Sequence, residues 1–168
     1  MMAARRGSVA GGSGGSPSRA STAGGSGGSP SRASTVAALQ TALAAEQAAS
    51  YGYGVVGAHL TGTAFNIASA DCVLHERARD ALTRLITSLG ATPRAAAAAY
   101  KLPIGVSSAA DAARLAVDLE VEVVASYVDL AAVPDPRLRT LAARNMQNAY
   151  VRAARWGAKS RPFPGLAP

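Results

Sequence analysis

Three ionisable side chains, Glu46, His75 and Glu120, fall on helical stripes whose other members are mostly apolar. Glu46, for example, shares the spacing of Leu43 and Tyr53. A carboxylate in an apolar interior is unfavourable unless a cation, a proton, a metal ion or hydrogen-bond donors face it. Two carboxylates and an imidazole can together hold iron, manganese or zinc. These three residues are therefore our candidate site for a single divalent metal ion.

Arginines in the last helical segment offer the same carboxylates another partner. Arg152 and Arg155 are our candidates for a buried ion pair, because either one, turned inward, would neutralise Glu46 or Glu120. Hydrogen bonds from nearby tyrosines such as Tyr53 are a further alternative for Glu46. We favour the ion pair, since a lone histidine on an apolar stripe is more often a hydrogen-bonded core residue than a metal ligand.

Other kinds of catalytic chemistry find little support in the sequence. An all-helical pattern provides no strand-to-helix turn for a nucleophilic serine, and the glycine-rich start has no GxxxxGK[ST] phosphate loop. The single cysteine, Cys72, excludes an intrachain disulfide and a zinc site built from four cysteines. We assign no catalytic residue and predict no cofactor beyond the candidate metal ion, so we expect a protein without enzymatic activity.

Four long segments with helical spacing of apolar residues must position the candidate side chains. They run over about residues 35–60, 64–89, 108–133 and 136–157. Gly90 is typical of the end of the second, and Asp135 followed by Pro136 of the start of the fourth. The connection between the second and third is long, and residues 95–100 within it are predicted to form a helical turn. This pattern predicts an all-α antiparallel four-helix bundle of the ferritin-like type.

The first 35 residues have a different composition from the rest of the chain. The segment AGGSGGSPSRAST at residues 10–22 is repeated without change at residues 23–35. Gly, Ser and Pro at this density predict a disordered tail over residues 1–35, before a bundle over residues 36–158 and an irregular end over residues 159–168. Two identical copies could present one short peptide twice to a protein partner.

The distribution of charge argues against several partners. The net charge is +7, but four of the 17 basic residues precede residue 36, which leaves 13 basic and 10 acidic residues in the predicted bundle. We therefore do not expect nucleic-acid binding, although an RNA- or ribosome-associated factor that uses the arginines of the fourth segment remains a weaker alternative. The chain has neither a continuous apolar stretch long enough for a membrane span nor a signal peptide. We expect a cytoplasmic protein.

Small residues in the first segment favour close contact between helices. Gly52, Gly54 and Gly57 leave room for another helix, either inside the bundle or in a second subunit. On this basis we expect a homodimer.

Several stretches of the chain resemble a known family. ALAAEQAASYGYGVVGAHL, HERARDAL, LGATPRAAAAAYKLP and YVRAARWGAKSRPFPGL are similar to actinobacterial ferritin-like proteins of unknown function, and the resemblance covers residues 36–166. It implies the four-helix fold and a cytoplasmic actinobacterial setting, and it brings no established activity.

The wider ferritin-like group implies a di-metal centre that this sequence only partly matches. That group places one Glu on each of two helices and a Glu-x-x-His pair on each of the other two. Here Cys72 stands where the Glu before His75 would be, and the fourth segment offers Asn145 and Asn148 instead of a second pair. The comparison implies a degenerate di-metal site in a binding or structural protein. A metal-binding ferritin-like protein with redox activity is the alternative.

Overall fold

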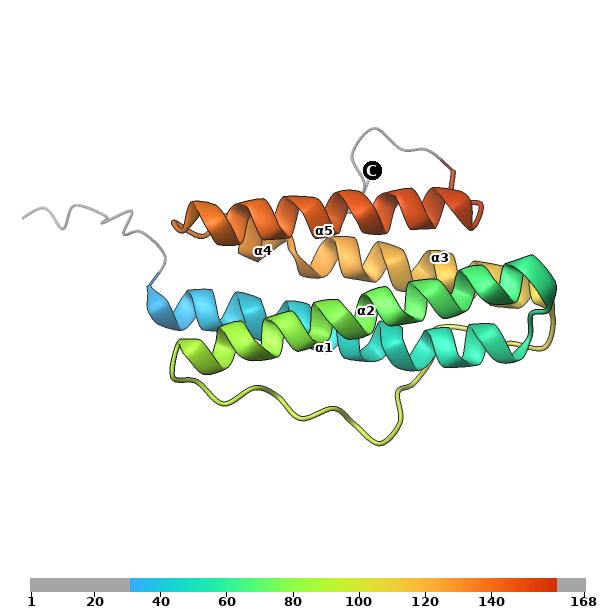
Figure 1. Ribbon diagram of the computed structural model, residues 1–168, viewed down its shortest axis with the longest axis horizontal. Helices are drawn as coiled ribbons and strands as arrows, with labels where there is room; N and C mark the ends of the chain where they lie inside the picture. The colour runs from blue at the N-terminus through green and yellow to red at the C-terminus, as the bar shows by residue number, and fades with distance from the viewer. Residues whose placement is uncertain (1–30, 160–168) are drawn as a thin grey trace, which may run out of the picture.

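The computed structural model describes residues 31–159, and this part of the chain is all-α, as predicted (Figure 1). Four long helices carry the fold, with one additional turn between the last two. Their bounds are Arg32–Ala58 for α1, Gly62–Ser88 for α2, Ala109–Ser126 for α3, Val128–Ala131 for the single turn α4 and Pro136–Arg155 for α5. Residues 1–30 and 160–168, which hold most of the predicted tail and of the predicted irregular end, lie outside the described residues.

The helices begin and end at residues that satisfy their free backbone groups. The side chain of Ser31 accepts a hydrogen bond from the backbone N–H of Ser34 at the start of α1, and that of Asp135 accepts one from Arg137 at the start of α5. Gly90, with a φ of +68°, follows α2, where a left-handed backbone favours glycine. The helix ends predicted at Gly90 and Asp135 are confirmed.

The third predicted helix is interrupted. It was expected to continue through Leu130, but α3 ends at Ser126 and α4 starts at Val128. The hydroxyl of Ser126 donates to the carbonyl of Val123 at 2.8 Å, and the N–H of Tyr127 bonds to the carbonyl of Val124, three residues back. Such bonds compete with the regular helical pattern and bend or tighten a helix, which explains the break.

The four long helices lie side by side along one common direction (Figure 1). α1 packs against both α2 and α3, and α3 packs against α5. α2 and α5 do not pack closely against each other, so the bundle is open along this side. None of the helices within residues 31–159 combines the length and apolar character that a membrane span requires.

The long connection after α2 crosses the outside of the bundle without regular structure (Figure 1). The helical turn predicted at residues 95–100 is wrong. Side chains of α1 hold this segment instead, because Gln40 bonds to backbone groups of Thr92 and Arg94, at 2.7 and 2.9 Å, and Gln47 donates to the carbonyl of Arg94 at 2.9 Å. These bonds satisfy extended backbone that would otherwise seek helical partners.

Only one of the three glycines singled out in α1 sits at a tight helix contact. A Cβ atom on Gly52 would lie 2.5 Å from a methyl carbon of Leu119 on α3, whereas one on Gly54 would meet nothing within 4 Å. A Cβ on Gly57 would make only ordinary contact with Phe65. Gly52 therefore allows α1 and α3 to approach closely, and this approach brings the polar centre of the bundle together.

Candidate functional site

The three predicted site residues meet in the middle of the bundle. Glu46 comes from α1, His75 from α2 and Glu120 from α3, and each is at most 1% exposed. His75 lies between the carboxylates, with Nδ1 2.7 Å from Oε2 of Glu46 and Nε2 3.2 Å from Oε1 of Glu120. Since a carboxylate oxygen only accepts, both contacts are hydrogen bonds when both ring nitrogens carry a proton.

Two buried tyrosines donate to the same carboxylates. The hydroxyl of Tyr127 lies 2.8 Å from Oε1 of Glu46, and that of Tyr53 lies 2.7 Å from Oε1 of Glu120. Burial, followed by the nearby carboxylate charge, raises the pKa of both tyrosines, so they remain neutral donors. Tyr53 also stacks on the His75 ring, with centroids 5.1 Å apart.

Arg152 of α5 completes this polar centre. Its Nε donates to Oε1 of Glu120 at 2.7 Å and its Nη2 to Oε2 at 2.9 Å, which is a bidentate pair. The Arg152 side chain is 11% exposed and that of Glu120 is 0% exposed. We call the residues Glu46, Tyr53, His75, Glu120, Tyr127 and Arg152 the central cluster.

The central cluster balances its own charge at neutral pH. Burial alone would lower the pKa of His75, but hydrogen bonds to Glu120 and Glu46 and the charges of both carboxylates outweigh it and raise that pKa to about 9. Burial would raise the pKa of Glu120, whereas His75 and Arg152 lower it overall. The centre thus holds two carboxylates, one imidazolium and one guanidinium, and no buried side-chain polar atom within residues 31–159 lacks a hydrogen bond.

A second ion pair lies nearer the surface. Nη2 of Arg155 approaches both carboxylate oxygens of Asp71, at 2.5 and 2.6 Å, and Nε1 of Trp156 donates to Asp71 at 3.0 Å. The Asp71 side chain is 2% exposed, whereas that of Arg155 is 46% exposed. This outer pair ties the end of α5 to α2.

The donor groups of the central cluster do not fit a two-metal centre. Its carboxylates and imidazole are already bonded to each other, and the Arg152 cation faces both oxygens of Glu120. Cys72, in the position of the missing Glu, points its thiol to the carbonyl of Ser50 at 3.5 Å. No group of three or more His, Cys, Asp or Glu residues within residues 31–159 has an arrangement that could hold a metal ion.

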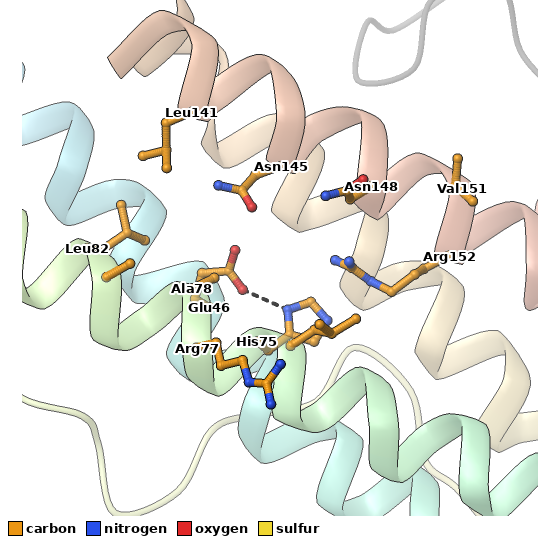
Figure 2. Close-up of a pocket in the computed structure, with 12 residues that line it drawn as sticks. Glu46, His75, Arg77, Ala78, Leu82, Leu141, Asn145, Asn148, Val151 and Arg152 are labelled. Carbon is orange, nitrogen blue, oxygen red and sulfur yellow. Dashed lines mark hydrogen bonds and ion pairs between the residues drawn. The ribbon is translucent and has the colours of Figure 1, made fainter. Parts of the chain in front are cut away.

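A cleft of about 470 Å³ leads from the surface to the central cluster, along the open side between α2 and α5 (Figure 2). Glu46 and His75 form part of its inner wall, Arg152 reaches into it from α5, and the exposed Arg77 lines it from α2. A cavity of this size is in the range of small-molecule sites, which are about 300–1,000 Å³.

The structure brings Glu46, His75, Glu120 and Arg152 together but places Arg155 on Asp71 instead. Sequence reasoning missed Asp71 and the hydroxyl of Tyr127 as polar partners. Their spacing carries a signal, because Asp71 precedes His75 by one helical turn and Tyr127 follows Glu120 by two.

The other arginines of α5 are less available than the sequence suggested. Arg139 donates to the carbonyls of Val133 and Pro134, at 3.1 and 2.5 Å, and Arg152 and Arg155 form ion pairs. Arg137 and Arg144 are exposed. The basic face of α5 is therefore smaller than a count of its arginines indicates.

Comparison with known proteins places the chain in a family. Residues 38–168 match the model of a domain of unknown function, DUF4439. The chain belongs to this family. A crystal structure of a conserved hypothetical protein, rv2844, from Mycobacterium tuberculosis is similar to this DUF4439 protein, with 35% sequence identity and a TM-score of 0.72 over 74% of this chain and 95% of that one. No curated protein matches.

Proposed function

We propose that this DUF4439 protein is a ferritin-like bundle whose metal centre has been replaced by an internal ion pair, and that it acts as a non-catalytic binding protein. Two helical hairpins joined by one long connection support the ferritin-like assignment. The bidentate contact between Arg152 and Glu120 carries the proposal, because a fixed guanidinium supplies the positive charge that a metal ion would supply to a ferritin-like centre.

A metalloprotein with redox activity is the competing function. The proximity of Glu46, His75 and Glu120 supports it, since two carboxylates and an imidazole are ligands that a single iron, manganese or zinc ion can use. To accept an ion there, His75 would have to lose a proton and Arg152 would have to leave Glu120. Metal binding would therefore release protons and open the cluster.

Elemental analysis distinguishes the two functions. The protein is purified without chelator or added metal, alongside Glu46→Ala and His75→Ala. Glu122→Ala is the matched control, because it removes an exposed acidic side chain two residues after Glu120. We expect less than about one tenth of an equivalent of transition metal in every sample, because the candidate ligands are already bonded to each other and to Arg152. A structural site of useful affinity would instead retain its ion on purification. A near-stoichiometric metal, retained by Glu122→Ala and lost from the other two variants, would overturn the proposal.

RNA binding has less support than either function. Three of the five arginines on α5 make contacts inside the protein. We infer that RNA would bind only weakly and that its affinity would fall steeply with salt concentration. Sequence-specific RNA binding that persists in high salt and is lost in Arg137→Gln with Arg144→Gln would contradict this inference.

A further inference from the structure

The two ends of the α2–α5 cleft differ in polarity. Leu82 of α2 and Leu141 of α5 lie at one end, and Arg152 lies toward the other (Figure 2). Arg77 lines the cleft from α2, between these two ends (Figure 2). The stretch of α2 from Leu74 to Leu82 spans about 12 Å. The cleft is thus elongated, with an aliphatic end at Leu82 and Leu141 and a cationic end at Arg152, beside which Val151 also lies (Figure 2).

Several donors in the cleft are not used within the protein. Arg77 and the side-chain amides of Asn145 and Asn148 have no hydrogen bond or ion pair within residues 31–159. Arg152 uses Nε and Nη2 for Glu120, and its Nη1 has no partner in the same range. The cleft therefore presents N–H groups from both helices to whatever enters it.

The charge around the cleft favours an anion. Both oxygens of Glu46 already accept hydrogen bonds, from Tyr127 and His75, and both oxygens of Glu120 accept from Arg152. With His75 protonated, these two carboxylates are matched by His75 and Arg152. Arg77 is then an additional positive charge, and because it is exposed and unpaired within the described residues, its charge is available to a ligand.

We propose that the α2–α5 cleft binds a small amphipathic anion, with a carboxylate or phosphate at the Arg77 guanidinium and an aliphatic chain toward Leu82 and Leu141. Guanidinium groups suit either anion, and the two leucines with the neighbouring alanines of α2 suit the chain. The proposal deepens the proposed function, on which it rests, by naming the class of ligand. It adds no chemical step.

Calorimetric titration of the metal-free full-length protein tests this site. The probes are octanoate and octyl phosphate, with octylammonium and octanol as controls for charge, and acetate and inorganic phosphate as controls for the chain. We expect at least one of the two amphipathic anions to bind with a Kd below about 1 mM, and every control to bind at least about tenfold more weakly. The better of the two anions identifies the headgroup.

Matched variants locate the binding. Arg77→Gln removes the available charge and is expected to weaken the better anion about tenfold without changing stability, because Arg77 has no partner to lose within the described residues. Arg84→Gln makes the same change at an exposed arginine on α2 that does not line the cleft, and we expect no effect.

The ligand proposal would be overturned by no binding of either amphipathic anion, by binding of octylammonium as tight as that of the anions, or by equal loss of affinity in Arg77→Gln and Arg84→Gln. Binding of acetate or inorganic phosphate as tight as that of the amphipathic anions would also overturn it, because the apolar end would then contribute nothing to affinity. The metal analysis reports separately on the proposed function. A metal-free protein that binds none of the probes would leave that function standing.

Discussion

The two arginine–carboxylate pairs of α5 lie one helical turn apart and differ in how they meet water. Arg152 contacts Glu120 where both side chains are nearly or fully buried, whereas Arg155 contacts a buried Asp71 from a position that is 46% exposed. Desolvated partners must satisfy each other, but an exposed cation is screened by solvent. An arginine–carboxylate pair can therefore be a central contact of the bundle at one position and a minor contact at the next turn.

The largest expected effect comes from breaking the inner pair. Arg152→Met keeps the volume and removes the charge, which leaves Glu120 with hydrogen bonds from Tyr53 and His75 alone. We expect a loss of about 3–5 kcal/mol in the free energy of unfolding, measured by urea denaturation. A loss below about 1 kcal/mol would show that the inner pair resembles a surface pair.

Raising the pH should weaken the inner region selectively. The pKa of His75 in the folded protein is about 9, above the value of about 6.5 in an unfolded chain, so the folded state binds this proton more tightly. Its stabilisation is complete below about pH 6.5 and is lost as the pH rises through about 9, and the total is on the order of 3 kcal/mol. Urea denaturation of the protein and of His75→Gln across this range measures the difference. Parallel pH profiles for the two proteins would contradict the assignment.

The close approach of α1 and α3 is expected to have an intermediate effect. Gly52→Ala would place a Cβ 2.5 Å from the Leu119 side chain, next to Glu120, and we expect a loss of about 1–3 kcal/mol. Gly54→Ala is the matched control, because a Cβ there meets nothing within 4 Å and alanine favours a helix. Thermal unfolding should rank Gly54→Ala at or above the unmodified protein. Equal losses in both variants would show that α1 and α3 do not rely on this contact.

The outer pair should give the smallest effect. Arg155→Gln removes a half-exposed cation and leaves Asp71 with the indole N–H of Trp156, so we expect a loss of about 1 kcal/mol that shrinks in high salt. The comparison with Arg152→Met in the same buffer is the measurement. A loss as large as that of Arg152→Met would remove the distinction between the two regions.

Local sequence signals predicted the helices better than their contacts. Asp135 with Pro136, and Gly90, fix helix ends through bonds within a few residues, and both were correct. The break at Tyr127 and the extended segment around residues 95–100 were missed. The latter depends on bonds from Gln40 and Gln47 to residues about fifty positions away, and no periodicity carries such information.

The central cluster was predictable in its members but not in its pairing. Helical spacing brought Glu46, His75 and Glu120 to one level, and it left open whether an arginine or a tyrosine faced each of them. The choice depends on the relative rotation of four helices, which positions Tyr127 on Glu46 and directs Arg155 away from the cluster. The open side between α2 and α5, and hence the cleft, has no signature in any single helix.

The most direct test of the internal ion pair is a double-mutant cycle in the presence of a chelator. The free energy of unfolding is measured for the unmodified protein, Arg152→Met, Glu120→Gln and the double variant. We predict that the double variant is more stable than the sum of the single losses by at least about 1 kcal/mol, because removing both partners leaves no stranded charge. Losses that add to within about 0.3 kcal/mol would contradict the claim that Arg152 and Glu120 form a coupled internal ion pair.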